Sequence, residues 1–261
     1  VMIDRSELMA VFPLAIMKCG AAYMPLDPHF PEDRLSFMCE DAGVSLILAD
    51  DGMVQQVMPS WDKGLFESSK IATLPEGKAE LPSDFCGSSL MVILYTSGST
   101  GKPKGVMLEQ AGLVNWCEGY KGLTHMGNDD HTLAYANFGF DAHMIDIWGT
   151  FYAGACVYVL DNDTRLDLVA ISEFVNSNKI TKAFFTTQIA YQMATLFDMP
   201  TLKTIATGGE KLPGAFEPVP GTKVEHGQVV GARRDVHHDH IYKHGCKHGG
   251  ILLAVFSGIL P

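Results

Sequence analysis

The residues from Leu94 to Val106 combine the side chains and the backbone freedom that phosphate binding requires. They read Leu-Tyr-Thr-Ser-Gly-Ser-Thr-Gly-Lys-Pro-Lys-Gly-Val. Glycines allow a tight turn whose N–H groups converge on an anion, hydroxyls donate to phosphate oxygens, and ammonium groups neutralise their charge. We therefore expect a phosphate at Thr96, Ser97, Gly98, Ser99, Thr100, Gly101, Lys102 and Lys104. A surface turn rich in Gly and Ser is the alternative.

The same stretch is not a Walker loop, because Pro103 follows Lys102 where that motif has Ser or Thr. Two other places carry polar residues directly after apolar runs. Asp141 is one of them, and a carboxylate there is most simply a helix N-cap. The other is Gly208-Gly209-Glu210, which without further context predicts only a turn.

The elements that would position these residues alternate between strand and helix patterns. An apolar run, 90–95, predicts a buried strand leading into the loop, and 109–121 predicts a helix directly after it. The dipole of that helix would then add to phosphate binding. Later strands are expected at 155–160, 180–187 and 202–207, with helices at 144–154, 164–177 and 188–197. This order predicts an α/β fold with a largely parallel sheet flanked by helices, whereas residues 51–88 predict a loop-rich connection.

Composition limits the classes of function. The chain has 261 residues, 47% of them hydrophobic, and a net charge of −11. It is therefore too apolar to be disordered, and its acidity argues against nucleic acid as a partner. No signal-peptide pattern and no apolar run of membrane-spanning length is visible, so we expect a cytoplasmic protein without a membrane partner.

Three separate stretches resemble a known family. Residues 95–106 resemble the phosphate loop of the adenylate-forming (AMP-binding) superfamily, which includes acyl-CoA synthetases, luciferases and the adenylation domains of nonribosomal peptide synthetases. Residues 17–35 resemble the signature Lys-x-Gly-x-Ala-Tyr-x-Pro-Leu-Asp-Pro followed by Pro-x-x-Arg-Leu of the amino-acid-activating members. Residues 140–154 resemble their pattern Phe-Asp-Ala-x-x-x-Asp/Glu-Ile-x-Gly-x-x-x-x-Gly. The chain is therefore most similar to part of a peptide-synthetase adenylation domain, and the fold implied is a partial N-terminal subdomain of the adenylate-forming fold.

The resemblance also implies roles for individual residues. In that family the Asp of the third pattern is a buried carboxylate that pairs with the α-ammonium of the amino acid, a role that falls on Asp141. The remaining implied substrate-pocket residues are Ala142, Ile145, Thr186 and Thr207. Gly208, Gly209 and Glu210 would border the nucleotide. The cofactors of an intact relative are ATP and Mg²⁺, and its partners are an amino-acid substrate and a carrier protein with phosphopantetheine. No catalytic residue and no metal ligand is assigned in this chain.

The sequence changes character near Val219. Six of the ten histidines fall between His226 and His248. Such a cluster suits a zinc or nickel site, and it equally suits a solvated His-rich tail. A shifted reading frame also explains why the histidines are clustered, because histidine codons that are read one nucleotide later encode Thr, Ile or Met. When the codons of 231–242 are read in the shifted frame, they can encode Gly-Pro-Asp-Glu, which resembles the family's missing magnesium motif. We therefore predict a partial adenylation domain at 1–218 and a frameshifted, poorly ordered tail at 219–261.

The expected activity follows from the parts that the chain contains. The resemblance implies ATP-dependent activation of an amino acid as an aminoacyl adenylate, followed by loading onto a carrier-protein thiol. Because the magnesium Glu and the C-terminal subdomain with the catalytic Lys are not recognisable, we expect this chain alone to adenylate weakly or not at all. Two other classes remain open: an adenylate-forming ligase acting on an acyl or aryl acid, and a non-enzymatic fragment or His-rich metal binder.

Overall fold

The structure is a computed structural model, and it describes most of the first 208 residues. The described ranges are 1–77, 80–96 and 102–208, together with the backbone of 228–231, 242–245 and 252–254. The chain divides into two units, one formed by 1–116 with 137–141 and the other by 117–136 with 142–261. Each unit has its own sheets.

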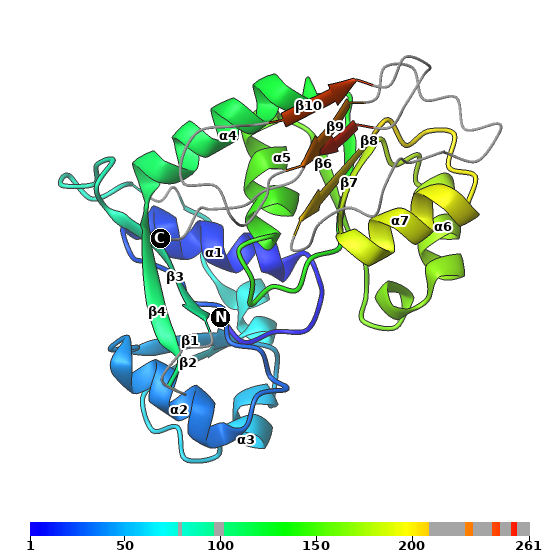
Figure 1. The fold of residues 1–261 in the computed structure, drawn as a ribbon. Coiled ribbons are helices and arrows are strands. Elements are labelled where there is room, and N and C mark those ends of the chain that lie inside the picture. Colours follow the sequence, from blue (N-terminus) through cyan, green and yellow to red (C-terminus); the bar gives the residue numbers. More distant parts are fainter. Residues whose placement is uncertain (78–79, 97–101, 209–227, 232–241, 246–251, 255–261) are drawn as a thin grey trace. The chain divides into compact units, whose positions relative to one another are not determined.

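The first unit contains two small sheets and several helices (Figure 1). Its elements are α1 (Leu8–Lys18), α2 (Glu32–Asp41), β1 (Leu46–Ala49), α3 (Met53–Val57), β2 (Gly64–Glu67), η1 (Ser68–Thr73), β3 (Leu90–Thr96), β4 (Lys104–Glu109) and the start of α4 (Gln110–Thr124). Strands β1 and β2 pair in parallel, and β3 and β4 form an antiparallel hairpin. A further bridge joins Tyr23 to Val92 of β3.

Helix α2 illustrates how the sequence builds this unit. Glu32 and Asp33 lie in its first turn, where the helix dipole favours negative charge. Leu35, Met38 and Cys39 follow at the spacing of one helix face, and all three are buried. Burial also raises the pKa of the Cys39 thiol to about 11. That face packs in a core with β1 and α3, and Ile93 and Tyr95 of β3 pack against the same core.

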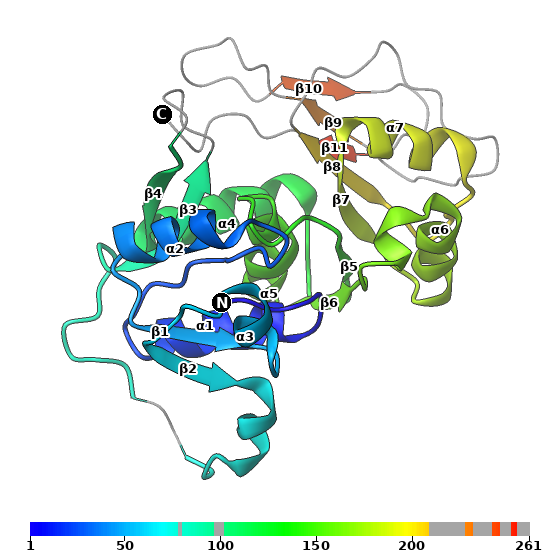
Figure 2. The ribbon, with the colours of Figure 1, turned by 90° about the horizontal axis from the view of Figure 1, so that it is seen from below.

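The second unit is organised by one sheet with the strand order β10-β9-β11-β8-β7-β5-β6 (Figure 2). Its elements are the end of α4, β5 (His131–Ala134), η2 (Ile145–Gly149), α5 (Thr150–Ala153), β6 (Cys156–Val159), η3 (Thr164–Leu166), α6 (Leu168–Ser177), β7 (Lys182–Thr186), α7 (Thr187–Leu196), β8 (Thr204–Gly208), β9 (Gln228–Gly231), β10 (Tyr242–Gly245) and β11 (Leu252–Ala254). Strands β6, β5, β7 and β8 are all parallel. The predicted parallel sheet is thus confirmed.

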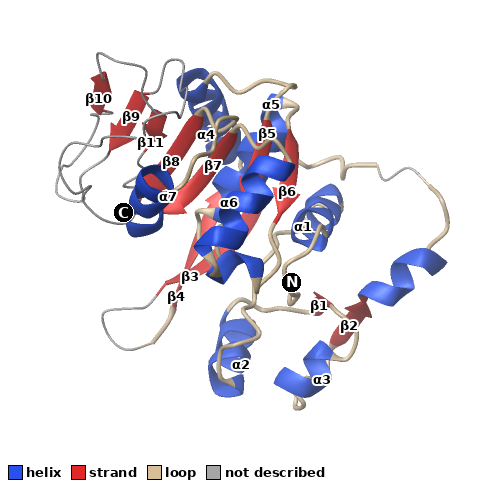
Figure 3. Ribbon diagram, turned by 90° about the vertical axis from the view of Figure 1, so that its right-hand side faces the viewer, coloured by secondary structure: helices blue, strands red, loops and turns tan. Residues whose placement is uncertain are grey.

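Helices cover both faces of these four strands, as Figure 3 shows. Ile171 and Val175 of α6 and Met193 of α7 pack in one core with Leu133 and Phe185 of the sheet. On the other face, Thr132 Oγ1 of β5 lies 2.7 Å from Thr150 Oγ1 of α5. A parallel sheet buried on both faces explains why β7 reads as a continuous run without polar and apolar alternation.

Two expectations about the elements were wrong, and one strand was missed. Residues 51–88 are not only loop, because they contain α3, β2 and η1, and β2 pairs with β1. The helix expected from residue 164 begins at Leu168, since Asp167 caps it by accepting hydrogen bonds from Val169 N and Ala170 N. The helix expected at 109–121 is confirmed as α4, which begins at Gln110, but the strand β4 between the phosphate loop and this helix was not expected.

The region after residue 208 is described only in part. The backbone of β11 pairs in parallel with β8 and β9, and β10 pairs antiparallel with β9. The histidine side chains lie outside the description, so the tail's frameshift origin and the domain boundary at 218 stay predictions. No helix in the described ranges has both the length and the apolar character needed to cross a membrane.

Candidate functional site

The predicted phosphate loop is the turn of the β3–β4 hairpin. Thr96 pairs with Lys104 across the hairpin, and Tyr95 pairs with Gly105. Ser97, Gly98, Ser99, Thr100 and Gly101 lie between these pairs and outside the described residues. Hairpin pairing therefore brings the two ends of the loop together.

Two exposed lysines follow the turn. The ammonium of Lys102 lies 5.8 Å from the centre of the Phe37 ring of α2, a cation–π distance. Within the described ranges, neither Lys102 nor Lys104 forms an ion pair with an acid. Both ammonium groups can therefore neutralise an anion at this end of the hairpin.

The expected contribution of a helix dipole to this loop is wrong. Gln110 N, at the start of α4, donates to Ser89 O at 3.0 Å, beside the first residue of β3. The helix N-terminus thus lies at the opposite end of the hairpin from the Thr96–Lys104 pair. Six residues of strand separate the two, roughly 20 Å at the usual rise. The N-terminus of α4 is therefore too far away to contribute to a phosphate at this end of the hairpin.

Asp141 lies in a turn after Phe140 and before the π-helical turn η2. Its carboxylate is exposed, unlike the buried carboxylate that we expected, and Phe140 beside it is 63% exposed. The capping position of η2 is occupied by Met144, so Asp141 is not the N-cap of that turn. No hydrogen bond or ion pair of the Asp141 side chain occurs among the described residues, which leaves it available to an ammonium ligand.

The segment before Asp141 is held by the Tyr-x-Pro-Leu-Asp-Pro motif. Phe138 stacks on Tyr23 with ring centres 6.4 Å apart, and the amide of Asn137 donates to Asp27 Oδ2 at 3.2 Å. Burial acts to raise the pKa of Asp27, but hydrogen bonds from His29 and Asn137 outweigh it and lower that pKa. The ionised carboxylate therefore anchors Asn137, four residues before Asp141.

Three other predicted residues meet at the carboxyl edge of the parallel sheet. Thr186 ends β7 and pairs with Gly208, which ends β8, and Thr207 pairs with Phe185. Ligands of open parallel sheets bind at this edge. Thr186 is exposed, whereas Thr207 is fully buried and its hydroxyl has no hydrogen-bond partner among the described residues. Gly209 and Glu210 lie outside the described residues.

The last two predicted pocket residues precede and begin η2. Ala142 is partly exposed, and Ile145 is 7% exposed at the start of the π-helical turn. Such turns are rare and occur preferentially at functional sites. Because Asp141 and Ala142 belong to different units, the structure gives no geometry for a complete pocket.

Sequence reasoning missed Asp146. It is 3% exposed, and its Oδ2 accepts hydrogen bonds from Tyr135 N at 2.9 Å and Ala136 N at 2.7 Å. These N–H groups directly follow β5, so Asp146 holds the backbone that leads to the Asn137–Asp141 segment. Asp146 is the Asp of the Asp/Glu-Ile pattern, but nothing in the sequence indicated which groups its carboxylate contacts.

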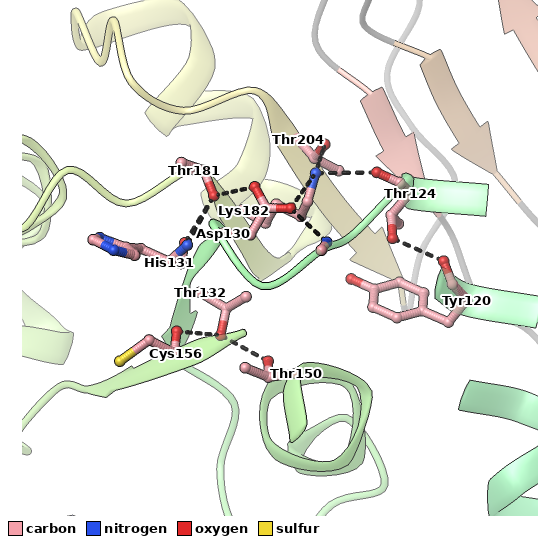
Figure 4. A network of polar contacts seen from close by, with 11 residues as sticks. Tyr120, Thr124, Asp130, His131, Thr132, Thr150, Cys156, Thr181, Lys182 and Thr204 are labelled. Atoms are coloured by element: carbon pink, nitrogen blue, oxygen red, sulfur yellow. Dashed lines mark hydrogen bonds and ion pairs between the residues drawn. The ribbon is translucent and has the colours of Figure 1, made fainter. Parts of the chain in front are cut away.

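The opposite, amino-terminal edge of the sheet carries a buried polar network (Figure 4). The ammonium of Lys182 lies 3.5 Å from Asp130 Oδ2 and donates to Thr124 O at 3.0 Å. Thr181 Oγ1 donates to Asp130 Oδ1 at 2.7 Å, and Gly127 N donates to Asp130 Oδ2 at 3.0 Å. Since these groups satisfy one another inside the protein, we interpret the network as structural.

A magnesium site is not assembled by the described residues. Among them, no three His, Cys, Asp or Glu side chains are grouped so that they could hold a metal ion. This excludes only a site built from three or more such side chains of the described residues, and we derive no step through the ion.

Comparisons with known proteins identify the family of the chain. The sequence profile of AMP-binding enzymes matches residues 1–217. Bacitracin synthase 1 of Bacillus licheniformis is 33% identical over 213 residues, which are 81% of this chain and 4% of that protein. Surfactin synthase subunit 2 of Bacillus subtilis (strain 168) is 35% identical over 215 residues, 80% of this chain and 6% of that protein. The chain thus spans a small part of the length of these relatives.

Solved structures share the fold. The nonribosomal peptide synthetase FmoA3, in a form bound to α-methyl-L-serine-AMP, superposes with a TM-score of 0.72 at 21% identity, covering 81% of this chain and 24% of that one. The N-terminal subdomain of Klebsiella oxytoca NpsA, in complex with 3-hydroxybenzoyl-AMSN, gives 0.68 at 23% identity, covering 81% and 53%. With the profile match over most of its length, the chain belongs to the AMP-binding enzyme family.

Proposed function

We propose that this chain is part of an amino-acid-activating adenylation domain of a nonribosomal peptide synthetase. The observation that carries the proposal is Asp141, an exposed carboxylate without a protein partner among the described residues, within the Phe-Asp-Ala pattern. An amino acid offers an ammonium group that such a carboxylate binds by a charge-assisted hydrogen bond. A simple acyl or aryl acid offers none.

The proposed chemistry uses the loop and the sheet edge together. The loop residues, with Lys102 and Lys104, hold the phosphates of ATP, and Gly208, Gly209 and Glu210 border the nucleotide. A carboxylate oxygen of the amino acid attacks the α-phosphorus, the bond from that phosphorus to the β-phosphate oxygen breaks, and pyrophosphate leaves. Positioning and charge neutralisation supply most of such catalysis. Mg²⁺, when bound, supplies further neutralisation of the phosphates.

The proposed substrate pocket combines Asp141 with four other residues, Ala142, Ile145, Thr186 and Thr207. The buried hydroxyl of Thr207 supports a polar contact in it, because a buried polar group without a partner is costly. The aminoacyl group would then pass to the thiol of a carrier protein's phosphopantetheine.

Substitution of Asp141 tests the proposal. We expect the chain to bind an aminoacyl-sulfamoyl adenosine more tightly than the matched analogue that lacks the α-amine. Asp141→Ala should remove that preference, weakening binding of the amine-containing analogue about tenfold or more, since a hydrogen bond to a charged group contributes about 1.5–3 kcal/mol. Isothermal titration calorimetry over a panel of side chains measures both affinities.

The matched control is Asp163→Ala, which removes an exposed carboxylate elsewhere in the chain. It should leave the preference for the amine unchanged. If wild-type protein binds the deaminated analogues or aryl analogues equally well, the amino-acid assignment is wrong and the acyl or aryl acid class takes its place.

A further inference from the structure

The base of the phosphate loop is tied to a helix that no phosphate-loop motif includes. Tyr95, one residue before the loop, donates its hydroxyl hydrogen to Asp41 Oδ2 at 2.6 Å. Met38 O lies 3.3 Å from the same hydroxyl, so the shorter contact with Asp41 is the main hydrogen bond. Asp41 is the last residue of α2 and stands 54 positions earlier in the chain.

The ring of Tyr95 also lies against its partner residue across the hairpin. A Cβ atom built on Gly105 would stand 3.1 Å from Tyr95 Cζ and 3.3 Å from Tyr95 Oη. The absence of a side chain at Gly105 thus lets the ring lie close to the β4 backbone. A ring displaced from Asp41 would have to move relative to Gly105, and so would alter the pairing at the loop's end.

A second contact joins the same helix to the other end of the loop. The ammonium of Lys102 lies over the Phe37 ring of α2, and the Phe37 side chain packs against the same core as Tyr95. Helix α2 therefore touches the chain both before and after the turn. Burial and the hydrogen bond to Asp41 raise the pKa of Tyr95, which keeps the phenol protonated and able to donate.

We propose that Asp41 is a positioning residue for the phosphate loop: by accepting the hydrogen bond of Tyr95 it fixes that ring against Gly105 and so sets the spacing of Thr96 and Lys104. This positioning role rests on the described contacts of Tyr95 with Asp41 and Gly105. The consequence of the Asp41–Tyr95 contact for nucleotide binding rests on the proposed function. Because Asp41 is exposed and Tyr95 partly exposed, the bond contributes little to global stability and acts locally.

Two variants remove the contact from either side, Tyr95→Phe and Asp41→Ala. We expect each to increase amide hydrogen exchange of residues 104–106 by up to about tenfold, the effect of losing one net hydrogen bond. Exchange in β7 and the thermal midpoint should stay at wild-type values. The double variant should exchange no faster than either single one, whereas Asp41→Asn, which keeps an acceptor oxygen, should restore most of the protection.

Glu40→Ala is the matched control, because it removes the neighbouring exposed acid of α2 and leaves Tyr95 untouched. The proposal is overturned if Asp41→Ala exchanges at residues 104–106 like Glu40→Ala, or if the two effects add in the double variant. ATP titration of the same proteins is a separate experiment that tests the proposed function. Absence of ATP binding by wild-type protein contradicts the proposed function, whereas the exchange data decide the positioning role in either case.

Discussion

Replacing Asp130 by alanine is expected to lower the free energy of unfolding by about 3–5 kcal/mol, because it leaves a buried ammonium without its counterion. Lys182 is 5% exposed and Asp130 is 8% exposed, so water cannot replace the lost carboxylate. The substitution also removes the acceptor of Gly127 N and the shorter of the two hydrogen bonds of Thr181 Oγ1, whose other acceptor is His131 O at 3.2 Å. Urea unfolding followed by circular dichroism measures the change.

The loss of stability caused by Asp130→Ala should depend on pH. Burial lowers the pKa of Lys182, and Asp130 is the group that counters this effect. Without Asp130 the folded-state pKa falls further below the unfolded value, so the unfolded state binds the proton more tightly. That penalty is fully present below the folded pKa of the variant and disappears as the pH rises. The stability gap to wild type should therefore narrow between neutral and alkaline pH.

Two variants control for simpler explanations. Asp129→Ala removes the adjacent exposed carboxylate and should change stability by less than about 0.5 kcal/mol. Asp130→Leu combined with Lys182→Met removes both charges and should recover much of the loss, as apolar replacements of buried pairs do. If Asp130→Ala behaves like Asp129→Ala, the network is not the structural element that we describe.

Replacing Asp146 by alanine is expected to cost about 3 kcal/mol, since two buried backbone N–H groups lose a charged acceptor. These are the amides of Tyr135 and Ala136, at 2.9 and 2.7 Å from Oδ2. Because they lie between β5 and the segment that carries Asp141, amine recognition should weaken as well. Denaturant unfolding and the analogue titration report the two effects separately.

Conservative replacement refines this prediction. Asp146→Asn keeps one acceptor oxygen and should lose less stability than Asp146→Ala. Glu173→Ala, an exposed acid on α6, serves as the control and should leave both measurements unchanged. Equal stability of Asp146→Ala and the control would contradict the anchoring role of this carboxylate.

The sequence was sufficient for the parts of the fold that depend on local pattern. The run from Leu90 predicts β3 to within one residue, and the β7 and β8 strands and the α7 helix follow the expected alternation. The carboxyl-edge placement of Thr186 and Thr207 follows from parallel pairing, which the alternation implies.

Long-range contacts were not predictable in the same way. Strand β4 was missed because a short run after Pro103 carries no strong strand signal until it pairs with β3. Asp130 and Lys182 stand 52 positions apart, and Tyr95 and Asp41 stand 54 apart, so only the folded chain brings each pair together. A surface carboxylate such as Asp141 and a buried one such as Asp146 look alike in sequence, since burial depends on neighbours from other elements.

Calorimetric titration with ATP tests the central claim most directly, namely that the β3–β4 turn holds the phosphates of a nucleotide. The proteins to compare are wild type, Lys102→Ala/Lys104→Ala, and a control that loses two exposed lysines elsewhere, Lys18→Ala/Lys70→Ala. We predict that wild type and control bind ATP equally, and that the loop variant binds at least about tenfold more weakly, since it loses two charge-assisted contacts. Equal affinity of all three proteins, or no ATP binding by wild type, would contradict the account.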